Sequence, residues 1–170
     1  MMPIKKILVP TDFSDRALHA LDYAIDLARL LRAELVVLFV VEPVQYASPA
    51  DLYGASVNLS MLFEEQQRIG REQLTRLAQQ LKSRRLEVQT VLETGVPYQA
   101  ITETAQVLKA DLIVMATHGR TGLSHIFLGS VAEKVVRSAA CPVLTVRSYP
   151  AGGRKSRLTG GRKKRGGAPG

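Results

Sequence analysis

The chain has 170 residues, of which 46% are hydrophobic, which is enough for one hydrophobic core but not for a second large one. Its net charge of +8 is unevenly distributed. Residues 1–147 carry 16 lysines or arginines and 15 acidic residues, whereas residues 148–170 carry 7 lysines or arginines and no acidic residue. The single cysteine, Cys141, excludes an internal disulfide. No apolar stretch approaches bilayer-spanning length and the first residues hold no apolar signal region, so we expect a cytoplasmic protein without membrane contact.

Apolar runs alternate with helical patterns along the chain, which is typical of βαβ units and a parallel sheet. Strands are predicted at about 5–9, 35–41, 86–92, 111–116 and 142–147, and helices at about 14–31, 59–83, 97–109 and 129–139. We expect an open α/β fold with a five-stranded parallel sheet in the order 3-2-1-4-5, helices on both faces and right-handed crossovers. Residues 42–58 form a longer connection than is usual between such units, so we interpret them as a mobile flap near a pocket.

The first predicted strand runs into Pro10-Thr11-Asp12-Phe13-Ser14, where Ser14 is a candidate N-cap of the first helix. In open parallel sheets, ligands bind beyond the carboxyl ends of the strands, where the strand order reverses, and Asp12 would lie there. Two interpretations of its carboxylate stay open. It could contact a ribose or a phosphate-bound metal, or it could serve only the turn and the helix cap.

The fourth predicted strand is followed by a loop that contains Gly119, Gly122 and Gly129 and leads into Ser130 and a helical pattern. Glycines let the backbone approach an anion closely, and a helix that begins here would direct its free N–H groups and positive dipole end toward it. The loop therefore resembles a phosphate cradle. The plainer alternative is that the glycines only turn the chain and Ser130 only caps the helix.

Several other kinds of site are excluded by the same residues. The turn after the first strand has no glycine and the chain has no Gly-Lys-Ser or Gly-Lys-Thr, which argues against a dinucleotide fingerprint and a Walker P-loop. His118 and His125 have no third metal ligand at useful spacing, and Ser124 lacks a nucleophile-elbow context. Cys141 follows two alanines and precedes a proline, which favours a small buried hydrophobe. We expect any catalysis to be incidental.

Four segments together resemble the universal stress protein family: Lys6 to Ser14, Thr117 to Leu123, Gly129 to Val136 and Cys141 to Val146. They come in the family's order and span about residues 4–147. The resemblance implies a Rossmann-like fold of the adenine nucleotide alpha hydrolase type. The family's ATP-binding branch carries glycine, two residues, glycine, nine residues, glycine and a hydroxyl residue. Gly119, Gly129 and Ser130 match this motif, but Ala116 replaces its first glycine and places a methyl group where the backbone would approach ribose or phosphate.

The resemblance also implies which residues form the ATP site. Backbone N–H groups at Gly119, Gly129 and Ser130, with the Ser130 hydroxyl, would hold phosphates. The backbone of Val40 would contact adenine, and Asp12 would contact ribose or a phosphate-bound Mg²⁺. The predicted cofactor-binding residues are Pro10, Thr11, Asp12, Val40, Ala116, Gly119, Arg120, Gly122, Gly129, Ser130 and Val131.

We therefore expect a small ATP-binding stress-response regulator, in which nucleotide occupancy modulates conformation or partner binding. The alternative is a nucleotide-free dimeric interaction module with a polyanion-binding basic tail. Ala116 is the feature that favours this alternative, because its methyl group would narrow the site.

Two further contacts follow from the C-terminal part. Val143–Val146 would form the edge strand without charge or proline, so a second copy could pair with it in a homodimer, as the family resemblance also implies. Residues 148–170 are basic and glycine-rich, so we expect a disordered tail outside a domain of residues 1–147. Such a tail could contact nucleic acid non-specifically. We expect the core to need none of its apolar residues.

Overall fold

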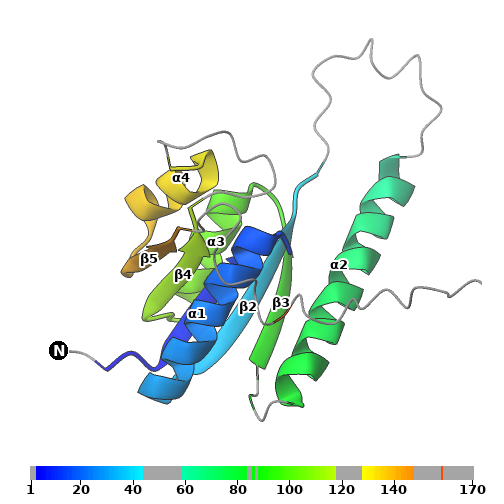
Figure 1. The fold of residues 1–170 in the computed structure, drawn as a ribbon. Helices are drawn as coiled ribbons and strands as arrows, with labels where there is room; N and C mark the ends of the chain where they lie inside the picture. Colours follow the sequence, from blue (N-terminus) through cyan, green and yellow to red (C-terminus); the bar gives the residue numbers. More distant parts are fainter. Residues whose placement is uncertain are drawn as a thin grey trace, which may run out of the picture.

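The computed structural model describes residues 3–43, 59–83, 88–117 and 128–147, together with Leu86 and Leu158. Strands and helices alternate along the chain (Figure 1). The strands are β1 (Lys6–Thr11), β2 (Glu34–Val41), β3 (Val88–Thr94), β4 (Leu112–Ala116) and β5 (Val143–Val146). The helices are α1 (Asp15–Leu31), α2 (Leu59–Lys82), α3 (Pro97–Val107) and α4 (Ser130–Ser138). Residues 44–58 lie outside the described residues, so the flap stays a prediction.

The strands form one parallel sheet in the order β3-β2-β1-β4-β5, which confirms the predicted order. β1 lies at the centre and pairs with β2 along its whole length, from Lys6 with Glu34 to Thr11 with Phe39. β5 lies at one edge and β3 at the other. This order places the chain's first strand beside the point where the strand order reverses.

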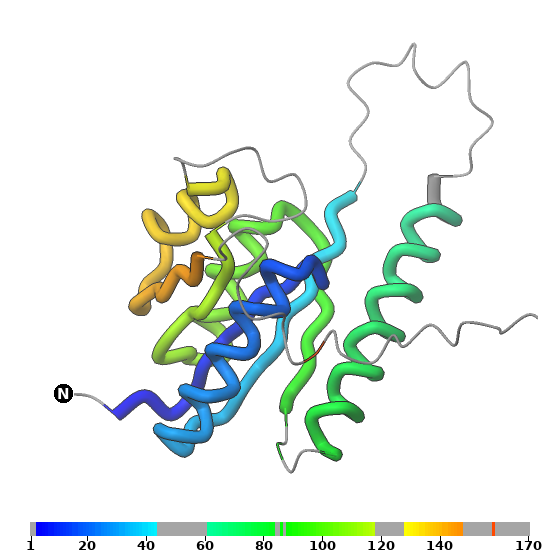
Figure 2. The backbone as a smooth tube through the Cα atoms, viewed as in Figure 1, coloured from blue at the N-terminus to red at the C-terminus, as the bar shows by residue number. Residues whose placement is uncertain are grey.

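Alternate residues of the strands face two separate cores, because successive side chains of a strand point to opposite faces. On one face, Ile7 and Val9 of β1 pack with apolar residues of α1 and α2. On the other face, Leu8 of β1 packs with apolar residues of α3 and α4. Figure 2 shows α2 running alongside β3 and β2, the two strands of the sheet that it contacts. Both faces of the sheet are therefore covered by helices, as predicted.

A single glycine lets α2 lie close to the sheet. Gly70 is buried, and a Cβ atom at this position would lie 2.6 Å from ring carbons of Phe39 and 3.1 Å from Leu92 Cδ1. Both distances are shorter than ordinary van der Waals contact. The helix therefore approaches β2 and β3 only because residue 70 has no side chain.

Four predicted boundaries were wrong by two residues, namely the end of β1, both ends of β3 and the end of α3. β3 begins at Val88 and not at residue 86, because the Leu86 N–H donates to the Leu81 carbonyl at 3.1 Å and closes the turn after α2. α3 ends at Val107 and not at residue 109, because Lys109 takes the left-handed conformation with a φ of 52°. A residue of this conformation commonly ends a helix.

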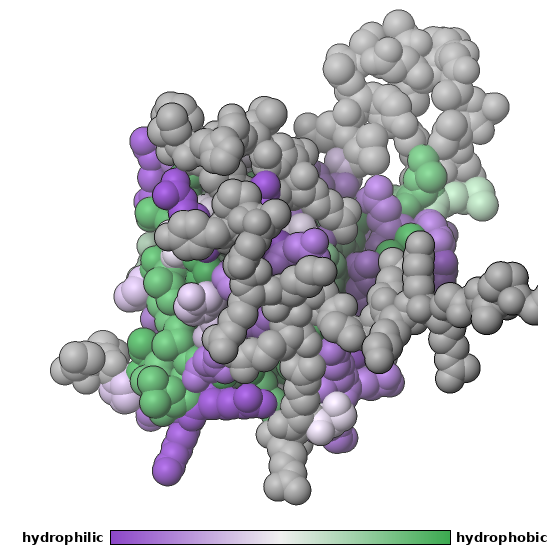
Figure 3. Space-filling view, in the orientation of Figure 1, coloured by the Kyte–Doolittle hydropathy of each residue, from purple (hydrophilic) through white to green (hydrophobic). Residues whose placement is uncertain are grey.

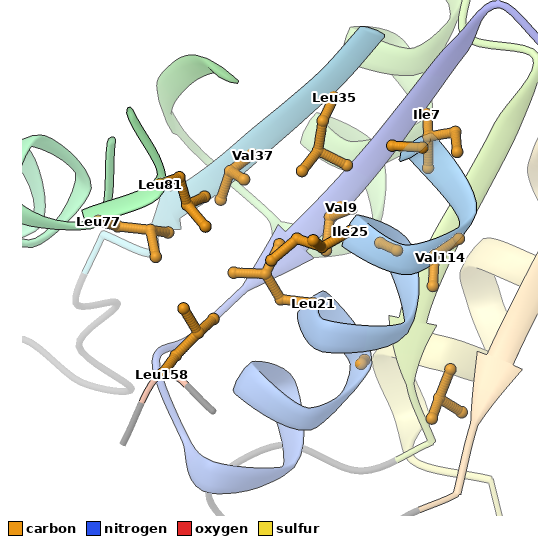
Figure 4. Close-up of a cluster of buried hydrophobic side chains, with 14 of the residues drawn as sticks. Ile7, Val9, Leu21, Ile25, Leu35, Val37, Leu77, Leu81, Val114 and Leu158 are labelled. Atoms are coloured by element: carbon orange, nitrogen blue, oxygen red, sulfur yellow. The ribbon is translucent and has the colours of Figure 1, made fainter. Parts of the chain in front are cut away.

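Leu158 corrects the expectation that the core needs no apolar residue of the tail. Its side chain is only 8% exposed and belongs to the core cluster of α1 and α2. Figure 4 shows it pointing toward Leu77 of α2 and Leu21 of α1. The segment 148–170 is basic and glycine-rich on average, and this average composition does not show that a single leucine packs in the core. The other residues of the segment lie outside the described ones, so the predicted division of the chain stays a prediction.

Within the described parts of the chain, no helix combines the length and the apolar character needed to cross a membrane.

Candidate functional site

The candidate site lies at the carboxyl ends of β1 and β4, where these two neighbouring strands separate. Their pairing stops at Leu8 and Ile113, although β1 continues in register with β2 as far as Thr11. Pro10 lies beyond the β1–β4 pairing, in a place that suits a residue without an N–H to donate. The topology thus separates two strand ends at the position where parallel α/β proteins bind ligands.

β1 ends in a turn that side-chain oxygens hold together. Ser14 donates to Asp12 Oδ1 through both its hydroxyl, at 2.6 Å, and its backbone N–H, at 3.0 Å. The buried Thr11 accepts the Phe13 N–H on its Oγ1 at 3.0 Å. Ser14 Oγ also accepts the Ala17 N–H at 3.2 Å and so caps α1, as predicted. Asp12 therefore serves the turn, and the same bonds fix its carboxylate at the strand end.

Phe13 joins the ends of β1 and β2. It takes the left-handed conformation with a φ of 60°, which is uncommon for a bulky residue and must be held by its surroundings. Its ring packs against that of Phe39, with 5.2 Å between the ring centroids. Phe13 follows Asp12 and Phe39 precedes Val40, so each ring of the pair is next in sequence to a predicted contact residue.

Val40, the predicted adenine contact, is the second-last residue of β2. Its backbone is in register with Glu93 of β3, and the next residue, Val41, accepts the Gly95 N–H on its carbonyl at 3.0 Å. The Val40 side chain is half-buried and packs against the core of α3 and α4. A packed side chain is compatible with a backbone contact to a ligand, and that contact stays a prediction.

The end of β4 is tied to β5 and to the start of α4. Thr117 donates its N–H to the Val146 carbonyl at 3.1 Å and accepts the Gly129 N–H at 2.8 Å. The Gly129 N–H, a predicted phosphate donor, is therefore bonded to the Thr117 carbonyl in this structure, and its contact with a phosphate stays a prediction. Ala116, which ends β4 directly before Thr117, is half-buried.

The start of α4 leaves backbone donors at the same edge of the sheet. The first intrahelical bond runs from the Glu133 N–H to the Gly129 carbonyl at 2.9 Å, and the N-cap Gly129 provides no side-chain cap. The N–H groups of Ser130, Val131 and Ala132 precede this bond and are oriented along the helix axis away from the helix. An anion beyond the end of α4 would meet these donors and the positive end of the helix dipole.

Gly119, Arg120 and Gly122 lie outside the described residues, and their predicted roles stay predictions. Of the other predicted residues, the structure gathers Thr11 and Asp12, Ala116 and Ser130 at the carboxyl edge of the sheet, around the separated ends of β1 and β4.

Sequence reasoning missed Phe39, Gly70 and the contact role of Phe13. One signal was present, because an isolated glycine inside a long helical pattern often marks close packing. The aromatic pair gave no comparable signal, since it depends on the left-handed backbone at Phe13 and on the register of β1 with β2.

Two observations concern the titratable groups of the described residues. Burial raises the pKa of the half-buried Cys141 thiol, which keeps it protonated at neutral pH and supports its interpretation as a small hydrophobe. In the described ranges, no three histidine, cysteine or acidic side chains are gathered as a metal site.

The open parallel sheet, the carboxylate held after its first strand and the helix that begins after its fourth define an α/β protein with a candidate ligand site at its topological switch point. The universal stress protein family model matches residues 3–147, and the chain belongs to this family. The matched range agrees with the extent of the sequence resemblance.

Three similar proteins illustrate the relationship. Universal stress protein MJ0531 of Methanocaldococcus jannaschii is 41% identical over 144 residues, which cover 84% of this chain and 82% of that protein. The structure of UspA from Lactobacillus plantarum has a TM-score of 0.73 at 29% identity and covers 86% of this chain and 100% of its own. A universal stress protein solved in complex with cAMP has a TM-score of 0.59 at 25% identity and covers 86% of this chain and 98% of its own.

Proposed function

We propose that the protein is an ATP-binding regulator of the stress response, in which nucleotide occupancy changes conformation or partner choice. One observation carries the proposal: the Asp12 turn and the start of α4 lie at the same edge of the sheet, on two strands that separate there. The relative in complex with cAMP supports an adenine nucleotide as the ligand.

The start of α4 is the proposed phosphate-binding element. Ser130 and Val131 would donate their N–H groups to phosphate oxygens, and the exposed Ser130 would add its hydroxyl. Glu133 in the first turn places a negative charge near this site, but it pairs with Arg137 at 3.3 Å. We include Gly119, Arg120 and Gly122 because glycines allow close backbone approach and Arg120 could pair with phosphate charge.

The end of β1 and its neighbours would hold the rest of the nucleotide. Pro10 and Thr11 would flank the ligand, and Asp12 would accept a ribose hydroxyl or contact a phosphate-bound Mg²⁺. Because the described residues gather no set of three metal ligands, such an ion would depend mainly on phosphate oxygens, with Asp12 as its protein contact. When bound, the ion would neutralise phosphate charge. The two bonds from Ser14 would keep the Asp12 carboxylate oriented.

Ala116 and Val40 complete the proposed site. The backbone of Val40 would contact adenine at the end of β2. The methyl group of Ala116 would lie beside ribose or phosphate and set how closely the end of β4 approaches the ligand.

Titration calorimetry of the full-length protein with ATP and Mg²⁺ tests the proposal, and mass spectrometry of gently purified protein shows whether nucleotide is carried along. Binding heat that disappears in the Gly129→Val variant is the expected result. Absence of heat at millimolar ATP in the wild type, with heat in the Ala116→Gly variant, would mean that the methyl group has closed the site.

That second outcome would favour the alternative function, a nucleotide-free dimeric interaction module. The observation in its favour is Ala116 itself, a half-buried methyl group at the strand end. In this case the basic tail, with 7 lysines and arginines, would supply the function by contacting polyanions such as nucleic acid.

We also propose a homodimer that forms along β5. This strand is at the edge of the sheet, and Leu144 is 39% exposed at its centre. Figure 3 shows hydrophobic surface on the side of the molecule where β5 lies in Figure 1. A second copy would satisfy the free backbone groups of the edge and cover this surface.

A further inference from the structure

Leu158 occupies a groove between α1 and α2 that the proposed nucleotide site does not use. A pocket of about 160 Å³ remains in this groove beside the leucine. It is lined by Leu158 itself and by side chains from the turn before α1, the first turns of α1 and the second half of α2, namely Phe13, Leu18, Gln73, Arg76, Leu77 and Gln80. Gln80 Nε2 donates a long hydrogen bond, 3.5 Å, to the Leu158 carbonyl. Figure 4 shows the leucine side chain pointing into the core cluster.

We infer that this groove is a docking site for the chain's own C-terminal segment through Leu158, and that docking is coupled to nucleotide binding at the end of β1. The coupling rests on the proposed function, whereas the docking stands on the packing of Leu158 alone.

The sequence and the chain length both identify the occupant. Among residues 150–170, Leu158 is the one large hydrophobic side chain, surrounded by glycine and basic residues. The 11 residues from Arg147 to Leu158 can span about 36–40 Å when extended, so the segment reaches the groove from the end of β5 within the same molecule.

Phe13 connects the groove with the proposed nucleotide site, because it contributes to both. It lines this groove together with Leu158, and it follows Asp12 directly. Its ring packs on Phe39, the residue before Val40. Its left-handed backbone is held by neighbouring contacts, so a contact that is lost on one side of the ring loosens the turn that orients Asp12.

The docking is balanced closely enough for a ligand to shift it. Burial of one leucine stabilises the docked state by an amount similar to the conformational entropy lost when one or two residues are ordered. A nucleotide that binds better to the docked state then increases the docked population, and docking increases nucleotide affinity by the same factor.

Docking can be measured without any nucleotide. The chain contains no tryptophan, so the fluorescence of a single introduced tryptophan reports on its own surroundings. In the Leu158→Trp variant, the fluorescence emission should be shifted to the blue and protected from acrylamide, whereas the control variant Ala151→Trp should emit as a solvent-exposed indole. Because indole is larger than leucine, a second pair of variants carries the Cys141→Ser background with Leu158→Cys or Ala151→Cys. The thiol at position 158 should react more slowly with a maleimide.

Equal emission and equal thiol reactivity at the two positions would overturn the docking. Protection that grows with protein concentration would also overturn it, because the occupant would then be the tail of a second copy.

The coupling is tested by ATP titration of the Leu158→Asp variant, with Leu30→Asp as the matched control. Leu30 is 78% exposed on α1, at the end of the helix far from the groove. We expect ATP affinity to fall about fivefold in Leu158→Asp and to stay unchanged in the control, with unaltered circular dichroism in both. We also expect ATP to increase the blue shift of Leu158→Trp.

Unchanged affinity in Leu158→Asp would overturn the coupling. If the wild type binds no ATP, the proposed function fails, and the fluorescence and thiol experiments still decide the docking.

Discussion

Ser130 is the side chain whose removal should weaken nucleotide binding most directly. The Ser130→Ala variant loses a hydroxyl donor to a charged phosphate, a bond of about 1.5–3 kcal/mol, so ATP affinity should fall roughly ten- to a hundredfold. Calorimetry measures the change. Ser138→Ala is the matched control, because Ser138 Oγ donates to the Lys134 carbonyl at the opposite end of α4. An equal loss of affinity in both variants would contradict the phosphate contact.

Asp111 should make stability depend on acidic pH. Its Oδ2 accepts the backbone N–H groups of Lys5 at 2.8 Å and Lys6 at 2.9 Å, and these bonds lower its pKa below the ordinary value of 3.8. The folded state therefore binds the proton less readily than the unfolded chain. The resulting stabilisation is fully present above the ordinary pKa and is lost as the pH falls through the lowered one.

The Asp111→Asn variant should lack this pH-dependent contribution to the free energy of unfolding. Urea unfolding at a series of pH values from neutral to strongly acidic should show a smaller loss of stability on acidification than in the wild type. Glu103→Gln, at an exposed position of α3, is the control and should follow the wild-type curve. Parallel curves for Asp111→Asn and the wild type would refute the assignment.

At the scale of the elements, Gly70 sets how closely α2 approaches the sheet. The Gly70→Ala variant gains about 1 kcal/mol of helix propensity but forces a methyl group against the Phe39 ring, and overpacking of this kind costs about 1–3 kcal/mol. Phe39 also packs on Phe13, so the ring has little freedom to move aside. We expect a net loss of up to about 2 kcal/mol in urea unfolding. Gln79→Ala, at an exposed position of the same helix, should change stability little, and a stabilised Gly70→Ala would show that the ring moves freely.

β5 gives a prediction about assembly. Replacement of Leu144 by lysine places a charge at the centre of the edge strand, where desolvation in a paired interface is unfavourable. Sedimentation should show a shift from dimer to monomer. Val107→Lys, at an exposed position of α3, is the control and should stay dimeric. A wild type that is monomeric at micromolar concentration would refute the dimer.

The order of the elements was predictable from the sequence because it depends on local signals. Each strand is an apolar run of its own, and Ser14 marks the start of α1 with a hydroxyl that does cap the helix. The predicted start of β3 was wrong because the Leu86 N–H donates to a backbone carbonyl of α2, and the hydrophobicity of the sequence does not reveal this bond. The close approach at Gly70 depends on the register of two strands and a helix, and no single segment encodes it.

The position of the candidate site follows from the predicted topology, whereas the hydrogen bonds around it could not be predicted. The residues at the ends of β1 and β4 follow from the topology, since parallel strands end at the same edge. The bond from Gly129 to Thr117 depends on how the loop closes, and a motif cannot show whether a backbone donor is directed at a ligand or at the protein. Leu158 was missed for a related reason, because its partners lie on helices far away in the sequence.

For the whole molecule, the uneven charge predicts where polyanions bind. The sequence up to residue 147 is nearly neutral, so retention of DNA or RNA should come from the 7 basic residues of the tail. Binding should be indifferent to base sequence, and its affinity should fall with a log–log salt slope of about 6 at most. A gel-shift series across salt concentrations measures this slope.

Two variants separate the charge of the tail from its anchor. Deletion of residues 150–170 removes both, whereas replacement of Arg162, Lys163, Lys164 and Arg165 by glutamine keeps Leu158 in its groove. Both variants should fold and lose most of their polyanion affinity, because the phosphate contacts depend on the removed charges. Only the deletion should lower the unfolding midpoint in urea, by a small amount, since one buried leucine contributes about 1.5–3 kcal/mol before the entropy of ordering its segment is subtracted. Equal polyanion binding by the full-length and the shortened protein would place the nucleic-acid surface on the folded sheet and its helices.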